Sequence, residues 1–129
     1  LTQAIHDGTI TATAVHAVPL DDEDMLLQMD QRPAGLSGHH VVLPALWNAL
    51  VRERRWSIEQ LWQALSFGPS TLLDQPPERL ELGSRRWLLF DPNHSWCVSR
   101  DDPDAPRASN LPWIGRTLEG RVIACGLSR

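Results

Sequence analysis

Small apolar side chains alternate near the start of the chain. Ile10, Ala12 and Ala14 are separated by threonines, which gives a period of two residues. This pattern predicts a buried strand over residues 10–15 with small side chains on both faces. The acidic run that follows, residues 21–24, lacks the glycine and ligand alternation of a calcium loop, and we expect a solvated loop there.

Helical periodicity follows the acidic run. Apolar residues recur at spacings of three and four along one stretch, at Leu43, Leu46, Trp47, Leu50 and Val51. Because proline is tolerated in the first turn of a helix, Pro44 places the helix start near residues 37–40. Ser57 and Gln60 have the spacing of a capping box before a second apolar stripe. We therefore expect residues 38–74 to form a helical layer.

The pattern changes again from Pro76 onward, where proline and glycine separate short apolar runs. These runs predict strands over residues 87–90, 96–98 and 122–125. So few strands do not close a core, and we expect them to join a sheet whose other members lie elsewhere. The sequence thus predicts an α+β chain in two parts, residues 1–75 and residues 76–129.

Six tryptophans occur without a single tyrosine. Trp47, Trp62 and Trp87 fall on apolar faces, and we expect them in the core. Trp56 and Trp113 stand beside polar or turn residues and are expected at the surface, where an aromatic side chain suits a protein interface.

Composition bounds what the chain can be. With 129 residues, 42% hydrophobic and 22% charged, it suits one globular domain. It is too short for a (β/α)₈ barrel, which takes about 250 residues. A net charge of -4 gives no electrostatic reason to bind nucleic acid or an anionic membrane. The sequence contains no membrane-spanning or signal-peptide pattern. Cys97 and Cys125 each stand alone, and we expect them to be reduced packing residues. Together these features lead us to expect a cytoplasmic protein.

The segment from Asp7 to Leu20 reads Asp-Gly-Thr-Ile-Thr-Ala-Thr-Ala-Val-His-Ala-Val-Pro-Leu. It resembles the last barrel strand of dihydroorotases, cyclic-amide hydrolases of the amidohydrolase superfamily. In that family Asp-Gly-x-Ile-Asp-Ala-Ile-Ala runs into Thr-Asp-His-Ala-Pro-His. Without a gap, His16 falls on the catalytic aspartate, Ala17 on the first histidine and Leu20 on the last histidine. Pro19 is kept.

Later segments resemble the same family in the same order. They are residues 66–70 (Ser-Phe-Gly-Pro-Ser), 79–92 (ending Phe-Asp-Pro), 110–115 (Asn-Leu-Pro-Trp-Ile-Gly) and 118–122 (Leu-Glu-Gly-Arg-Val). Within the second of these, Arg86 and Trp87 replace the family's Ala-Asp pair. The resemblance implies the C-terminal end of a metal-dependent-hydrolase TIM barrel, with its last strand, catalytic-type loop and terminal helices in residues 1–75. Residues 76–129 would supply strands of a small β-sandwich and a C-terminal tail.

The resemblance also implies that the catalytic loop has changed. In the family the aspartate is the general base toward a metal-bridging water. His16 is neutral or positive where the metal site expects an anion, although a histidine can move protons near neutral pH and a role as substitute base or ligand stays open. The family's last histidine orients substrate, which Leu20 cannot do, and its Phe-Gly pair corresponds to Ala34 and Gly35, of which only Gly35 is kept.

No catalytic residue of the family is therefore expected in this chain. Zinc is the family's cofactor, but its other ligands lie in strands that have no counterpart here. His39 and His40 invite a metal site together with His16. Adjacent residues of a helix do not face one another, so we expect His39 and His40 to be structural or capping residues.

Two functions remain as hypotheses. The first is the C-terminal part of a dihydroorotase-like hydrolase of cyclic amides, in pyrimidine biosynthesis, inactive as this chain. The second is a non-catalytic homologue that acts as an interaction or scaffold protein, with aspartate transcarbamoylase as the partner that the resemblance suggests. Because a barrel strand without its neighbours leaves apolar faces exposed, we also expect contact with the remainder of a barrel or with a second copy.

Overall fold

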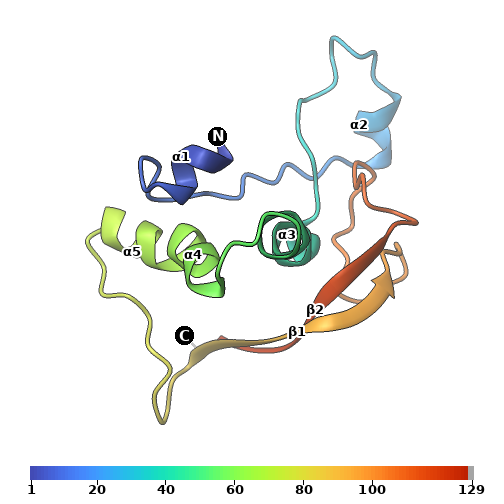
Figure 1. Cartoon of the computed structure of the whole chain (residues 1–129). Coiled ribbons are helices and arrows are strands. Elements are labelled where there is room, and N and C mark those ends of the chain that lie inside the picture. The colour runs from blue at the N-terminus through green and yellow to red at the C-terminus, as the bar shows by residue number, and fades with distance from the viewer. Residues whose placement is uncertain (128–129) are drawn as a thin grey trace.

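Helices fill the first part of the chain and a two-stranded antiparallel sheet fills the last part (Figure 1). The computed structural model describes residues 1–127. The α+β class is confirmed. The elements are α1 (Thr2–His6), α2 (Asp22–Leu26), α3 (His39–Leu46), the π-helical η1 (Trp47–Arg52), α4 (Ile58–Trp62), the π-helical η2 (Gln63–Phe67), α5 (Gly68–Leu72), β1 (Arg86–Cys97) and β2 (Thr117–Leu127).

The expected helical layer is confirmed, and so is its capping box. The Ser57 hydroxyl accepts the Gln60 N–H at 3.2 Å, and the Gln60 side chain accepts the Ser57 N–H at 2.8 Å. Pro44 differs from the expectation because it lies inside α3 rather than in its first turn. It cannot donate to the carbonyl one turn earlier, and the helix continues beyond it as the wider η1. The Asn48 amide donates to the Pro44 carbonyl at 2.8 Å.

The segment 10–15, predicted to be the last strand of a barrel, has no ladder partner within residues 1–127. Because the other strands of such a barrel lie outside these residues, the barrel strand stays a prediction. The segment lies on the helical layer, where the N–H and the hydroxyl of Thr13 both donate to the Ala64 carbonyl at 2.9 Å. The approach is close, since a Cβ on Gly68 would fall 1.7 Å from the Thr11 carbonyl oxygen. The alternation of side chains along the sequence predicts which of them share a face, but it does not identify the strand with which this segment would pair.

The acidic run is also more ordered than a loop. Asp21 caps α2, because its carboxylate accepts the Asp24 N–H at 2.8 Å while the Asp24 carboxylate accepts the Asp21 N–H at 3.2 Å. Acidic side chains in a first turn also offset the positive end of the helix dipole. The sequence therefore uses these carboxylates to start a helix.

Two of the expected strands are parts of one long strand. β1 runs from Arg86 to Cys97 and pairs with β2, with register shifts on both sides of Phe90 and Asp91. Residues 76–127 contain this one two-stranded sheet. That its strands belong to a β-sandwich whose other members lie elsewhere stays a prediction. Gly120 suits its place in β2 because its φ is +93° and the Phe90 ring lies 2.5 Å from the position that a Cβ would take.

The core consists of two clusters that α3 and η1 connect. One cluster contains Val41, Trp96, Val98 and Leu111, and the other contains Trp47, Leu50, Trp56 and Leu61. The second cluster also holds the hairpin, because Phe90 packs edge-on against Trp47 with ring centroids 5.3 Å apart. Trp56, expected at the surface, is thus buried.

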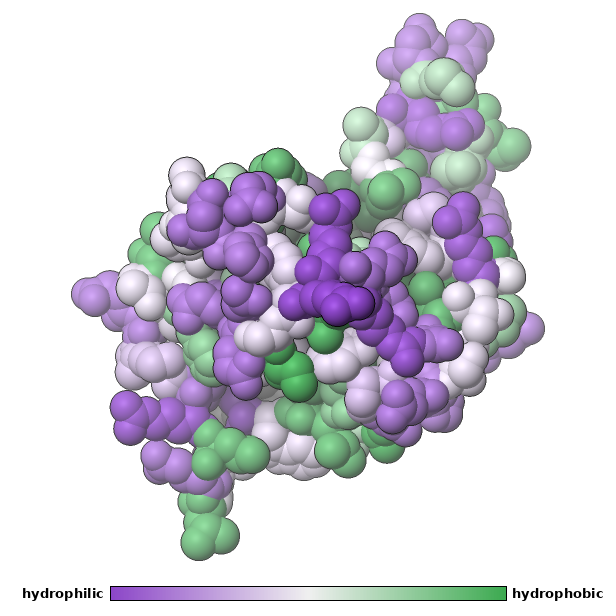
Figure 2. All heavy atoms as spheres, viewed as in Figure 1, coloured by the Kyte–Doolittle hydropathy of each residue, from purple (hydrophilic) through white to green (hydrophobic). Residues whose placement is uncertain are grey.

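Apolar side chains remain on the surface of the hairpin. Trp87, expected in the core, is 44% exposed, and Leu89 and Ile123 are more than half exposed. Figure 2 shows apolar side chains gathered on the lower part of the molecule, over β1 and β2.

Cys97 and Cys125 are exposed free thiols, so their expected packing role is wrong. Within residues 1–127 no helix is long and apolar enough to cross a membrane.

Candidate functional site

Leu20 and Gly35, two of the positions singled out in the sequence, line one pocket of about 340 Å³. The pocket lies where the loop after residue 15 meets the loop before α3 and the segment 109–112. Its lining includes Leu20, Met25, Arg32, Gly35, Asn110 and Leu111. Three separate segments of the chain therefore meet at this pocket.

The Asn110 side chain holds these segments together. Its carbonyl oxygen accepts the Leu20 N–H at 3.0 Å, and its amide donates to the carbonyls of Val18 at 2.8 Å and Gly35 at 3.1 Å. One half-buried amide thus bridges both loops. Sequence analysis placed Asn110 in a family-like motif but assigned it no role, because its partners lie 75 to 92 residues away.

Packing explains why position 35 is a glycine. A Cβ there would lie 2.4 Å from the Cβ of Val18, so any larger residue would push the two loops apart. The Gly35 carbonyl is already bonded to Asn110. Leu20 is 4% exposed and belongs to the core. Its N–H is bonded to the Asn110 side chain, and its carbonyl accepts the Ser109 N–H at 2.7 Å.

His16 and Ala34 do not join this pocket. Both are exposed, and the His16 ring makes no hydrogen bond within residues 1–127. The structure therefore separates the four family positions into two that meet, Leu20 and Gly35, and two that face solvent. A general base needs to lie within hydrogen-bond reach of its proton, and His16 lines neither this pocket nor the one described next.

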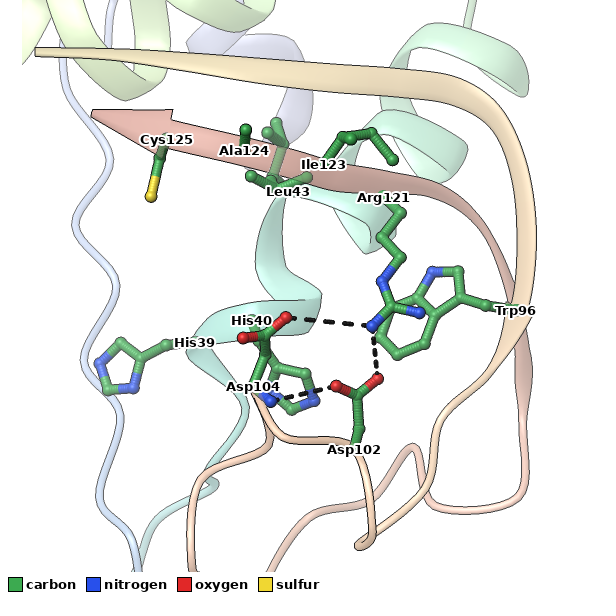
Figure 3. Close-up of a pocket in the computed structure, with 11 residues that line it drawn as sticks. His39, His40, Leu43, Trp96, Asp102, Asp104, Arg121, Ile123, Ala124 and Cys125 are labelled. Atoms are coloured by element: carbon green, nitrogen blue, oxygen red, sulfur yellow. Dashed lines mark hydrogen bonds and ion pairs between the residues drawn. The ribbon is translucent and has the colours of Figure 1, made fainter. Parts of the chain in front are cut away.

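A second pocket, of about 410 Å³, lies between the start of α3 and β2 (Figure 3). It is lined by side chains from the start of α3, from β1, from β2 and from the loop 101–106, among them His40, Trp96, Asp102, Asp104 and Arg121. Sequence analysis named only the histidines of this group. The remaining members lie on elements whose contact with α3 could not be read from spacing.

Arg121 organises the polar end of this second pocket. Its guanidinium donates to the Asp102 carboxylate at 2.8 Å, lies 3.9 Å from Asp104 and stacks over the Trp96 ring, 4.8 Å from the centroid. The Asp102 side chain is 8% exposed and also accepts the Asp104 N–H at 3.1 Å. This ion pair fixes the loop 101–106 against the sheet.

His40 lies beside the ion pair without joining it. Both ring nitrogens are buried, and neither has a hydrogen-bond partner in the described part of the chain. Burial lowers the pKa of His40, and the nearby Asp102 and Asp104 oppose that shift only in part. The imidazole is therefore neutral at pH 7, with one donor and one acceptor unused.

The histidines do not gather into a metal centre. His39 and His40 line the second pocket, whereas His16 does not. Among residues 1–127 no group of three or more His, Cys, Asp or Glu side chains is placed to hold a metal ion. These residues alone do not fit the zinc of the family, and no chemical step is assigned to zinc here.

Comparison with known proteins gives the context for these pockets. No family model matches the sequence. The chain is 34% identical over 124 residues to a probable dihydroorotase-like protein of Synechocystis, and 31% identical over 123 residues to a dihydroorotase-like protein of Pseudomonas aeruginosa. A dihydroorotase of Staphylococcus epidermidis is 28% identical over 121 residues. The chain is a homologue of the dihydroorotases. These alignments cover 93% to 96% of the chain but only 27% to 28% of each relative.

The fold of this dihydroorotase homologue has a counterpart in a solved structure. A D-hydantoinase (dihydropyrimidinase) from Thermus superimposes with a TM-score of 0.80 at 20% identity, over 97% of this chain and 28% of that chain. The arrangement of helices and hairpin described above is thus part of a larger known architecture. The resemblance seen in the sequence is confirmed.

Proposed function

We propose that this dihydroorotase homologue is derived from a cyclic-amide hydrolase and that its catalytic loop has become a packing element. The observation that carries the proposal is Leu20. At the position where the family has a substrate-orienting histidine, an apolar side chain is 4% exposed and its N–H is bonded to Asn110. A buried leucine cannot donate or accept a hydrogen bond, so this position supports the loop and offers nothing to a substrate.

The other family positions support the same proposal. His16 stands where the resemblance places the general base, but it is exposed and has no orienting partner among the described residues. The carbonyl of Gly35 is taken by Asn110. One backbone group of the Ala34–Gly35 pair is thus bonded to the protein itself.

The test is a ring-opening assay on dihydroorotate with the full-length protein, with and without added zinc. We expect no hydrolysis above the blank, and we expect the paired substitution His16→Asp with Leu20→His to leave the protein inactive. Zinc-dependent hydrolysis that is lost in His16→Ala and kept in His94→Ala would overturn the proposal, because His94 is exposed and lies outside both pockets.

The exposed hairpin favours an interaction role for this region. Trp87, Leu89 and Ile123 place large apolar surface in water, which is typical of interface residues. The occupant would be the remainder of a longer barrel-containing chain, a second copy, or aspartate transcarbamoylase as the resemblance suggests. Light scattering of the purified protein and co-purification with the transcarbamoylase separate these outcomes. A monomer that binds neither partner would count against the role.

A further inference from the structure

Three charged side chains and one histidine meet where the two parts of the chain touch. They are His40 at the start of α3, Asp102 and Asp104 on the loop 101–106, and Arg121 on β2. Figure 3 shows the His40 ring next to both carboxylates, and dashed lines join the Arg121 guanidinium to the same two carboxylates. We call these four residues the charge cluster. All of them belong to the described chain, so the cluster exists without any further strand or partner.

Negative charge is in excess in the charge cluster while His40 is neutral. Asp102 and Asp104 each carry a negative charge, and Arg121 carries the single positive charge that faces them. A proton on His40 adds a second positive charge and brings the formal charge of the cluster to zero. Opposite charges in contact stabilise one another, so the carboxylates favour the protonated form of the ring.

The two carboxylates are held very differently. The Asp102 side chain is 8% exposed, accepts from Arg121 at 2.8 Å and also accepts the Asp104 N–H at 3.1 Å. The Asp104 side chain is 73% exposed and lies 3.9 Å from Arg121, which is too far for a hydrogen bond. Asp104 is therefore the carboxylate that can turn toward a new partner without breaking an existing hydrogen bond.

The His40 ring is the partner that gains a charge as the pH falls. Both of its nitrogens are buried, and neither makes a hydrogen bond within the described chain. Burial lowers the pKa of His40, the two carboxylates oppose this shift, and Arg121 and the neighbouring His39 reinforce it. Among the residues that line the pocket, Trp96 of β1 carries no charge, and Cys125 of β2 is the remaining titratable group. A buried imidazolium needs an acceptor for each N–H that it cannot give to water.

We propose that protonated His40 forms an ion pair with Asp104, which joins the loop 101–106 to α3 at acidic pH. The imidazole takes its proton from water and becomes a donor at both ring nitrogens. The Asp104 carboxylate turns from solvent toward the ring and accepts one of these N–H groups, while Asp102 stays bonded to Arg121. Because the ordinary pKa of a histidine is about 6.5 and burial opposes the charge, the ion pair forms below about pH 6.5.

This ion pair makes the connection between the two parts of the chain dependent on pH. α3 belongs to residues 1–75, and the loop 101–106 belongs to the second part. The same loop leads into Ser109, whose N–H donates to the Leu20 carbonyl at 2.7 Å. A proton on His40 thus changes how a loop that continues to the first pocket is anchored. The inference goes beyond the proposed function and does not depend on it, because it requires neither a substrate nor the loss of hydrolase activity.

The first test follows the titration of His40 by NMR in the full-length protein with ¹³C-labelled histidine, from about pH 8 to about pH 5. The His40 signal is assigned by its absence in His40→Gln. Asp104→Asn should move the midpoint of His40 to lower pH, because the protonated ring loses its partner. Asp101→Asn is the matched control and should leave the midpoint in place, since Asp101 is exposed and does not line the pocket. An unchanged midpoint in Asp104→Asn, or an equal shift in both variants, would overturn the proposal.

The second test separates a formed ion pair from attraction at a distance. At the acidic end of the titration, the bonded ring N–H of His40 should exchange slowly with water and give a signal that Asp104→Asn abolishes and Asp101→Asn keeps. The amide signals of residues 101–106 should shift with the same midpoint as His40 and lose this shift in His40→Gln. A ring N–H signal that survives in Asp104→Asn would show that His40 has taken another partner. Loop amides that stay constant while His40 titrates would equally refute the proposal.

Discussion

Replacing Asn110 with alanine tests whether one side chain holds the two loops of the first pocket. The substitution removes the acceptor for the Leu20 N–H and both donors, to the carbonyls of Val18 and Gly35. It leaves the backbone of residue 110 in place, including the 3.3 Å bond from the Ser37 N–H to its carbonyl. The loss is therefore confined to three side-chain hydrogen bonds.

The magnitude follows from the burial of the groups that lose a partner. A net hydrogen bond contributes about 1 kcal/mol, and a buried group left unsatisfied costs about 1 to 3 kcal/mol. Leu20 is buried, so its N–H carries the larger penalty, while Gly35 is exposed and its carbonyl is rehydrated at little cost. We expect Asn110→Ala to lower the free energy of unfolding by about 3 kcal/mol.

Urea unfolding followed by tryptophan fluorescence measures this change. With a slope of about 1.5 kcal/mol per molar urea, the midpoint should fall by about 2 M. Asn93→Ala is the matched control, because Asn93 is exposed and its side chain makes no hydrogen bond within residues 1–127. If Asn110→Ala and Asn93→Ala shift the midpoint equally, the bridging role of Asn110 is refuted.

Three further predictions concern the helical layer and His40. Leu61 is fully buried, so Leu61→Ala should cost about 2 to 5 kcal/mol in unfolding free energy, while Leu82→Ala, at a fully exposed position, should cost almost nothing. Ser57→Ala removes the acceptor for the Gln60 N–H and should cost about 1 kcal/mol, whereas Ser57→Thr should keep most of the stability; an equal loss in both would argue against the cap. Burial lowers the pKa of His40 in the folded protein, so the unfolded chain binds a proton on this histidine more readily than the folded protein does. The free energy of unfolding should therefore fall as the pH drops below about 6.5. Urea midpoints at pH 7.5 and pH 5.5 measure that slope, and it should be smaller in His40→Gln; an unchanged slope would assign it to other groups.

The parts of the fold that were predicted correctly are those that depend on neighbours in sequence. The capping box at Ser57 needs only a partner three residues away, and the helical layer needs only its apolar stripe. The strand expected at residues 10–15 stays a prediction, because a ladder needs a second strand and residues 1–127 supply none for this segment. The prediction that Trp56 lies at the surface was wrong because of a turn in the backbone beside it. The left-handed turn at Arg55, with φ of 57°, brings the Trp56 N–H back to the Leu50 carbonyl and turns the ring into the core.

The sequence indicated candidate site positions only in the segments that resemble the dihydroorotase family. The resemblance singled out Leu20 and Gly35, and the structure brings both to one pocket. It gave no role to Asn110, the residue in the other part of the chain that joins them. The second pocket was missed except for its histidines, because Asp102 and Arg121 become neighbours only when the loop 101–106 folds onto β2. Charged pairs of this kind have no signature in spacing.

The contacts across residue 75 hold the two parts of the chain together without the side chains of residues 16–20. Val41 of α3 packs with Trp96 and Leu111 from the second part, and Asn48 donates to the Glu119 carbonyl at 2.6 Å. The hairpin is thus fixed to the helices by packing that does not involve residues 16–20. Once Asn110 ties those residues to the same framework, their side chains are constrained by packing alone. A leucine then serves position 20 better than a histidine, since a buried imidazole needs hydrogen-bond partners and the nearby backbone groups are already bonded to Asn110.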